Sequence, residues 1–133
     1  EIILTGEPFT AQQAYDWGIV NHITDDESLI DDTLATATYR IAQEALTNII
    51  RHADASDVIV KLTTKNKFLT MTISDNGVGF NAAKLIESEG LGVAGMQERA
   101  SLVSGTLDVQ SQPGDGTRVF FKAPLSVEDR RHI

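Results

Sequence analysis

The sequence predicts an α+β domain in which helices cover one face of a mixed, mostly antiparallel sheet. One long stretch has apolar residues at spacings of three and four, which is typical of an amphipathic helix. Two pairs of shorter segments alternate between apolar and polar residues, which is typical of antiparallel strands. Because the helical and the alternating patterns are partly segregated along the chain, the α+β class follows.

The composition indicates one acidic globular domain. Its 133 residues can bury a core without cross-links. The net charge of -8 disfavours nucleic acid and anionic lipid as partners. The absence of cysteine excludes disulfides, thiol catalysis and cysteine-ligated zinc. No apolar run approaches the ~20 residues of a membrane span and the start lacks the basic region of a signal peptide, so we expect a cytoplasmic domain without membrane contact.

The first part of the sequence predicts two helices. A short helix, residues 11–17, follows Thr10 as its N-cap and ends at Gly18. A long helix runs from Ser28 to Ala53. The apolar residues that share one face of the long helix are Leu34, Tyr39, Ile41, Ala42, Ala45, Leu46, Ile49 and Ile50.

The rest of the sequence predicts two strand pairs with a helix between them. The segments "SDVIVKLTT" and "KFLTMTIS" alternate and are joined by the turn "KNK". The segment "VAGMQERASLVSG" predicts an amphipathic helix closed by Gly105, and "TLDVQSQ" and "TRVFFKAP" alternate around the turn "PGDG". These elements span residues 56–64, 67–74, 93–105, 106–112 and 117–124.

The end of the second predicted strand, "ISDNGVGF", has an unusual composition. Asp75 is followed by Asn76 and then by two glycines, Gly77 and Gly79. Such residues occur in ordinary turns, and an Asn-Gly pair between two strands would indicate a tight hairpin. The next residues, "VGFNAAKLIESEG", do not alternate, so a local hairpin does not explain the segment.

The long predicted helix carries a polar stripe. Arg40, Glu44, Asn48 and His52 follow one another at intervals of four and would stack along one face. Most such stripes are simply solvated, but asparagine is a poor helix former. A carboxylate with an amide one turn later also suits a magnesium–nucleotide site, where the amide oxygen ligates the metal.

Two glycine-rich segments, "DNGVGF" at 75–80 and "GLGVAGM" at 90–96, follow the stripe in sequence. Glycines before a helix N-terminus let backbone N–H groups approach a phosphate. Neither segment is a phosphate loop or a dinucleotide-binding fingerprint, so each alone is weak evidence for a nucleotide site. The two segments together with the polar stripe are more specific evidence for such a site.

These residues resemble a known family. "YRIAQEALTNIIRHADAS", "DNGVGF", "GLGVAGMQERASLVSGTLDVQS" and "PGDGTRVFFKAP" resemble the ATP-binding catalytic domain of sensor histidine kinases, most closely the subclass of the nitrate sensors. The resemblance covers about residues 36–125 and implies a Bergerat-type two-layer α/β sandwich that binds ATP and Mg²⁺. It also implies partners in a full-length kinase: a dimerisation and phosphoacceptor domain and a response regulator.

The resemblance implies roles on the helix for three residues of the stripe. Asn48 matches the ligand of Mg²⁺, Glu44 a candidate general base, and His52 a basic residue near the phosphates.

The resemblance also implies roles for residues at the strand ends and for the glycines. Asp75 matches the aspartate that accepts a hydrogen of the adenine amino group, with Thr117 as the hydroxyl near it. Gly77 and Gly79 match glycines that let the base lie against the backbone. The glycines assigned to the phosphate side, with the neighbouring cofactor-binding methionine, are Gly90, Gly92, Gly95 and Met96.

The sequence departs from the family in two ways. Neither His22 nor His132 has the setting of the phosphoacceptor histidine, so we expect that domain to be absent from this sequence. Residues 1–24 instead resemble a helical segment of crotonase-family enoyl-CoA hydratases, without its catalytic residues. We therefore expect a chimera with a crossover between Thr24 and Gln43; the alternative is a kinase with an unusual N-terminal extension.

The expected organisation is a crotonase-like segment (1–24), an ATP-binding domain (25–125) and a charged tail (126–133). The leading hypothesis is a Mg²⁺-ATP-binding kinase module that does not phosphorylate itself in cis. The alternative is a recombined scaffold that keeps the fold but has lost nucleotide binding, and that could form a homodimer through an exposed strand edge. We expect no hydratase activity.

Overall fold

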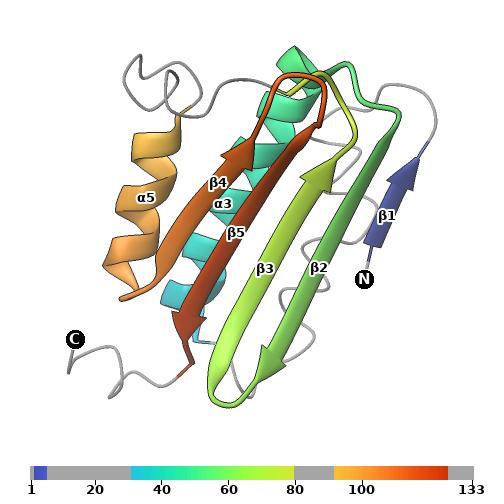
Figure 1. Ribbon diagram of the computed structural model, residues 1–133. Coiled ribbons are helices and arrows are strands. Elements are labelled where there is room, and N and C mark those ends of the chain that lie inside the picture. The colour runs from blue at the N-terminus through green and yellow to red at the C-terminus, as the bar shows by residue number, and fades with distance from the viewer. Residues whose placement is uncertain (1, 6–30, 80–91, 126–133) are drawn as a thin grey trace.

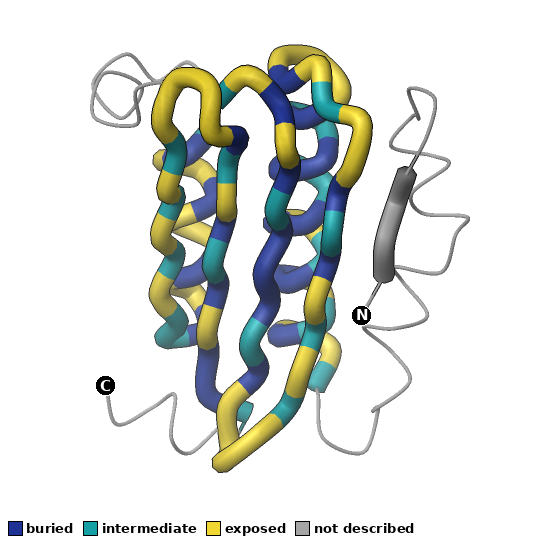
Figure 2. Tube along the Cα trace, turned by 45° about the vertical axis from the view of Figure 1, so that its right-hand side comes forward, coloured by how far each residue is buried: buried dark blue, intermediate teal, exposed yellow. Residues whose placement is uncertain are grey.

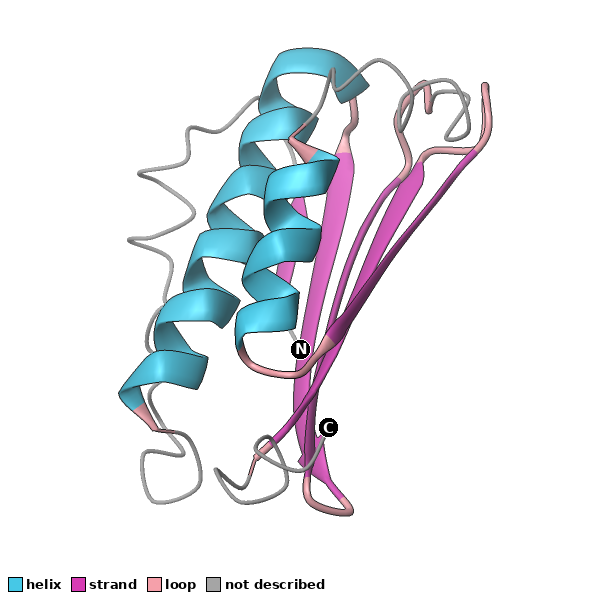
Figure 3. Ribbon diagram, turned by 90° about the vertical axis from the view of Figure 1, so that its left-hand side faces the viewer, coloured by secondary structure: helices cyan, strands magenta, loops and turns pink. Residues whose placement is uncertain are grey.

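The computed structural model describes residues 2–5, 31–79 and 92–125. Within them, two helices cover one face of a five-stranded sheet, with strand order β1-β2-β3-β5-β4 (Figures 1 and 3). The elements are β1 (Ile2–Thr5), α3 (Asp32–Asn48), the short π-helix η2 (Ile49–Ala53), β2 (Asp57–Lys65), β3 (Phe68–Asp75), α5 (Val93–Leu102), β4 (Thr106–Ser111) and β5 (Thr117–Pro124). The α+β sandwich expected from the sequence is confirmed.

Every pairing between the described strands is antiparallel. The parallel pairing that a mixed sheet would contain therefore does not occur among them. Two of these pairings follow from short connections: β2 and β3 are joined by the two residues 66–67, and β4 and β5 by the five residues 112–116. In the first turn Asn66 and Lys67 both have positive φ, of 53° and 69°, as a two-residue hairpin with the right-handed strand twist requires.

The helix α3 begins after Asp31, whose side chain accepts a hydrogen bond of 2.8 Å from the backbone N–H of Leu34. Residues 28–30, where the sequence placed the helix start, lie outside the described residues. Thr38 is fully buried on the inner face, and its hydroxyl donates to the carbonyl of Leu34 at 2.7 Å. The final turn of the predicted helix is not α-helical but forms η2.

The core lies between the helices and the inner face of the sheet. Figure 2 shows buried residues concentrated on the two central strands and on the helix face behind them. The largest fully buried side chains are Phe121, Leu34, Ile41, Leu69, Met71, Ile73 and Met96. Each Å² of apolar surface that these side chains remove from water stabilises the fold by about 25 cal/mol. This layer therefore holds α3 and α5 against the strands.

Four residues of the segment that resembles crotonases form the edge strand β1. They pair with the start of β2, from Ile2 opposite Val60 to Thr5 opposite Asp57. The predicted helix 11–17 and the charged tail 126–133 lie outside the described residues. None of the helices in the described part of the chain is long and apolar enough to cross a membrane.

The helix α5 ends differently from the sequence-based expectation. Ser104, not Gly105, has the left-handed conformation, with φ of 55°. The N–H of Gly105 bonds to the carbonyl of Ala100 at 2.8 Å and that of Ser104 to Ser101 at 3.0 Å, which is the Schellman pattern. Glycine is needed at 105 for a different reason: an added Cβ would lie 2.7 Å from the carbonyl oxygen of Lys122.

Gly105→Ala should lower the free energy of unfolding by about 1–3 kcal/mol because the new methyl group forces α5 away from β5. The matched variant Ser104→Gly should instead raise it, by up to about 1 kcal/mol, because it relieves a left-handed non-glycine residue. Urea denaturation measures both. Equal stability of Gly105→Ala and the parent would show that this contact is loose.

Candidate functional site

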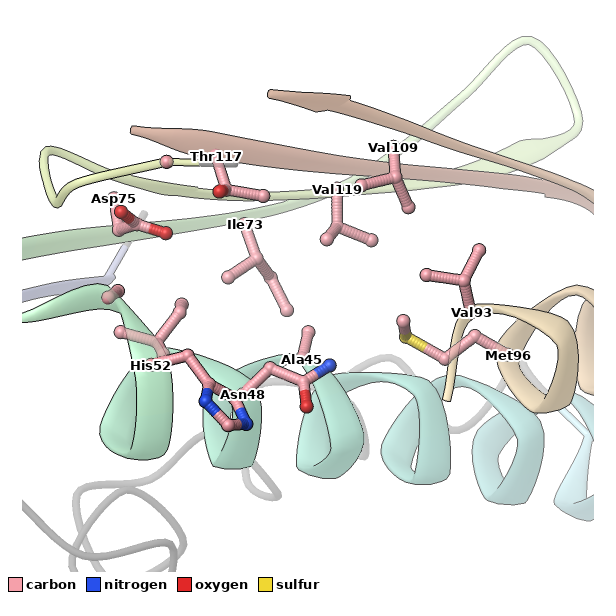
Figure 4. A pocket seen from close by; sticks show the side chains of 13 residues that line it. Ala45, Asn48, His52, Ile73, Asp75, Val93, Met96, Val109, Thr117 and Val119 are labelled. Carbon is pink, nitrogen blue, oxygen red and sulfur yellow. The ribbon is translucent and has the colours of Figure 1, made fainter. Parts of the chain in front are cut away.

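A pocket lies between the helix layer and the sheet, near the end of β3 and the start of β5 (Figure 4). One wall comes from α3 and η2, the opposite wall from the strands, and α5 contributes Val93 and Met96. Most of the lining is apolar. The polar residues that line it are Asn48, His52, Asp75 and Thr117.

Asp75 is the buried charge of this pocket. The residue is 9% exposed, and its Oδ1 accepts a hydrogen bond of 2.7 Å from the backbone N–H of Gly77. Its Oδ2 is buried without a hydrogen-bond partner in the described residues. A buried acceptor left unpaired lowers the free energy of unfolding by about 1–3 kcal/mol. A ligand that donates a hydrogen bond to Oδ2 would remove this destabilisation.

Burial raises the pKa of the Asp75 carboxyl above its usual value, and hydrogen bonds from the backbone N–H groups of Gly77 and Thr117, neither of them to Oδ2, offset part of this rise. Asp75 and Thr117 are direct partners in the β3–β5 ladder. Figure 4 shows their side-chain oxygens at the same end of the pocket.

The loop after Asp75 is held by backbone contacts on both sides. The N–H of Val78 donates to the carbonyl of Ala53 at 2.8 Å, and the carbonyl of Val78 accepts from Gly114 at 2.7 Å. An added Cβ at Gly77 would collide with the Ala53 carbonyl, and one at Gly79 with that of Gln112. Both glycines are thus required by the protein's own backbone. Of the two, Gly79 lines the pocket and Gly77 does not.

Asn76 was not singled out in the sequence analysis, yet it ties this loop to the start of β2. Its Oδ1 accepts from the N–H groups of Ser56 and Asp57, each at 3.0 Å. Its Nδ2 donates to the hydroxyl of Ser56 at 2.9 Å and to the carboxylate of Asp57 at 3.2 Å. The Asn-Gly pair signals a turn in sequence, but these partners, 19 and 20 residues away, could not be read from it.

The polar stripe divides between two hollows. Asn48 and His52 line the pocket with Asp75, whereas Arg40 and Glu44 line an adjoining hollow between α3 and α5. The boundary between the two groups lies inside α3, between Glu44 and Asn48, and of the stripe only His52 belongs to the π-helical turn η2. The stripe therefore forms two neighbouring groups, and Met96 lines both hollows.

The second hollow is completed by the start of α5. Gly92 precedes the helix with φ of +64°, and an added Cβ there would lie 2.6 Å from Oε1 of Glu44. A carboxylate near a helix N-terminus interacts favourably with the helix dipole. At Gly95, unlike Gly92, an added Cβ would meet no atom within 4 Å, so the protein itself leaves space for a side chain there. Gly90 lies outside the described residues.

The sequence and the fold are similar to those of known proteins. A family described as histidine kinase-, DNA gyrase B- and HSP90-like ATPases matches residues 33–127. The chain belongs to this family. The sensor protein VraS of Staphylococcus aureus is 42% identical over 91 residues, which is 68% of this chain and 26% of VraS. The signal transduction histidine-protein kinase/phosphatase DegS of Bacillus subtilis is 36% identical over 106 residues, 78% of this chain and 27% of DegS.

A solved structure supports the fold of this ATPase domain. The histidine kinase domain of the blue-light activated histidine kinase EL346 from Erythrobacter litoralis superimposes with a TM-score of 0.62 over 96% of this chain and 68% of that one, at 21% identity. The ATPase domain spans about a quarter of the length of VraS and DegS. The expected resemblance to histidine kinases is confirmed; the comparisons give no support to the crotonase resemblance.

Asp75→Asn should abolish stabilisation of the ATPase domain by ATP while raising, or at least preserving, its stability without nucleotide. The raised pKa means that ionised Asp75 opposes folding once the pH exceeds the folded-state pKa. This cost is relieved as the pH falls from there toward 3.8, the usual value. The stability difference between variant and parent should therefore shrink as the pH falls through that window.

Thermal unfolding from pH 7 to pH 3, with and without ATP, measures both effects. Asp115→Asn, an exposed turn residue, is the control and should change neither. An Asp75→Asn protein that still gains stability from ATP would contradict the assignment of this carboxylate.

Gly95→Ala should raise the stability of the protein alone by up to about 1 kcal/mol, because alanine favours the helix and the methyl group meets no neighbour. If a phosphate lies against this backbone, the same change lowers nucleotide affinity. Urea denaturation and calorimetric titration separate the two effects. Gly92→Ala should lose stability because of its close approach to Glu44, and unchanged affinity in Gly95→Ala would remove Gly95 from the site.

Proposed function

We propose that this domain binds Mg²⁺-ATP in the two adjoining hollows and serves as the catalytic module of a two-component sensor histidine kinase. The observation that carries the proposal is the unpaired Oδ2 of Asp75, buried at the polar end of an otherwise apolar pocket. A fully apolar pocket would bury no charge, because an unpaired buried carboxylate destabilises the protein. Its retention indicates a ligand with a hydrogen-bond donor at that position.

Adenine fits this chemistry. Its exocyclic amino group donates hydrogen bonds, and its flat ring would lie among apolar side chains such as Ile73, Val119 and Met96. The open position of the Asp75 carboxylate favours a donor group there and disfavours a carbonyl oxygen. We therefore assign Asp75, Thr117 and Gly79 to the base.

The phosphates and the metal would lie toward α3 and the start of α5. The side-chain oxygen of Asn48 is of the kind that ligates Mg²⁺, which usually completes its shell with phosphate oxygens and water. No cluster of three or more His, Cys, Asp or Glu side chains occurs in the described ranges, so the proposed metal site needs the phosphates themselves. We propose His52, Gly90, Gly92 and Gly95 as residues of the phosphate side.

Glu44 lies in the second hollow, beside Gly92 and away from the base pocket. This position supports its proposed role as a general base, because a base must meet the incoming phosphoryl acceptor and not the adenine. The acceptor would be a histidine of a separate dimerisation domain, followed by transfer to a response regulator, in the cytoplasm. VraS and DegS, which are longer, bear the names of a sensor and of a signal transduction kinase.

A scaffold without nucleotide binding is the second candidate, and one observation favours it. The space in the pocket that the centre of a water molecule can reach is about 40 Å³, room for roughly three waters. Movement of side chains such as the flexible Met96 would make room for a purine. In either case we propose a recombined origin for residues 1–24. The one structural feature in its support is that β1 is an edge strand, a position that a strand-forming sequence from another protein could also fill.

The test is a thermal-shift titration in which ATP raises the melting temperature in a magnesium-dependent way. Asn48→Ala should remove the increment due to magnesium but keep binding of metal-free ADP, and Asn48→Asp should change the magnesium dependence more than the metal-free affinity. Thr47→Ala, one position earlier on α3, is the control. No shift with ATP up to millimolar concentration would favour the scaffold, and equal losses with and without metal would remove Asn48 as a ligand.

A further inference from the structure

Two hydroxyl groups meet where β4 ends and β5 begins. Ser111 and Thr117 are direct partners in the β4–β5 ladder, and their oxygens, Oγ and Oγ1, lie 2.8 Å apart. The hydroxyl of Ser111 also donates to the carbonyl oxygen of Gly116 at 2.9 Å. Thr117 lines the pocket whereas Ser111 does not, so Ser111 lies beside a lining residue, on the neighbouring strand β4.

The number of hydrogens decides the direction of these bonds. A hydroxyl group carries one hydrogen, and a carbonyl oxygen can only accept. The hydrogen of Ser111 is therefore used by Gly116, and the bond between the two hydroxyls requires Thr117 to donate. Thr117 Oγ1 then has only lone pairs left, so it can act toward the pocket as an acceptor and not as a donor.

The second acceptor at this end of the pocket is Oδ2 of Asp75. The two residues are paired across β3 and β5, and Figure 4 shows their oxygens close to one another. Two acceptors side by side match a group that carries two hydrogens, such as an exocyclic amine. An oxo group in the same place would face lone pairs on both sides.

We propose that Ser111 is a specificity-determining positioning residue: by taking the hydrogen of Thr117, it restricts the site to purine nucleotides with an amino group at position 6 and disfavours 6-oxo purines. The inference rests on the proposed nucleotide binding and adds a residue outside the pocket to it. Asp75 alone would leave the Thr117 hydroxyl free to rotate and donate to an oxo group.

The experiment compares ATP with ITP, which differ by amino and oxo groups at position 6, in calorimetric titrations of the same protein. Ser111→Ala frees the Thr117 hydrogen, so the affinity ratio of ATP to ITP should fall by about tenfold, the order of one hydrogen bond. Ser111→Thr keeps a hydroxyl at this position and should restore the ratio. Ser101→Ala, which removes another hydroxyl bonded to a backbone carbonyl, is the control and should leave the ratio unchanged.

A second measurement guards against a general loss of structure. In a Thr117→Val background no hydroxyl remains to reorient, so Ser111→Ala should no longer change the ratio. Equal losses of ATP and ITP affinity in Ser111→Ala, or a ratio change that persists in the Thr117→Val background, would overturn the inference while leaving nucleotide binding intact. A parent protein that binds neither nucleotide would overturn the proposed function itself.

Discussion

The structure depends on the close backbone packing of the loop from Asp75 to Gly79. The loop lies between the carbonyl of Ala53 on one side and the β4–β5 turn on the other, and Val78 bonds to both. Because these contacts are between main-chain atoms, they leave no space for a side chain at Gly77 or Gly79. They join the end of the helix layer to the sheet, so the residues of η2, β3 and β5 that line the pocket keep their relative positions.

This rigid frame supports a residue that the fold alone would not favour. Asp75 is buried with one oxygen unpaired, and its raised pKa reflects the free energy needed to keep it ionised there. The same backbone that forces it inward supplies the hydrogen bond from Gly77 that limits the cost. The burial of this carboxylate thus lowers the stability of the protein without ligand, as the residues of functional sites commonly do.

The arrangement of elements could be predicted largely from local patterns. The four strands β2 to β5 lie within one residue of the segments predicted by alternation, because a half-buried antiparallel strand repeats every two residues. The helix α3 was also predicted, but its change to a π-helix at Ile49 was not, since the apolar spacing continues through it. Likewise Ser104, not the glycine beside it, adopts the left-handed conformation after α5, whereas Gly105 is needed for its close approach to Lys122.

The sequence by itself identified the residues that we propose for the site: the aspartate at the end of β3, the amide and carboxylate on α3, and the glycine segments. Only the tertiary structure decided how they are grouped. It placed Asn48 with Asp75 but Glu44 in a second hollow with Gly92, and it set the Ser111 hydroxyl beside that of Thr117. The reason is physical: residue type and spacing are local properties, whereas pocket membership and the direction of a hydrogen bond depend on partners that only the packed sheet and helices bring together.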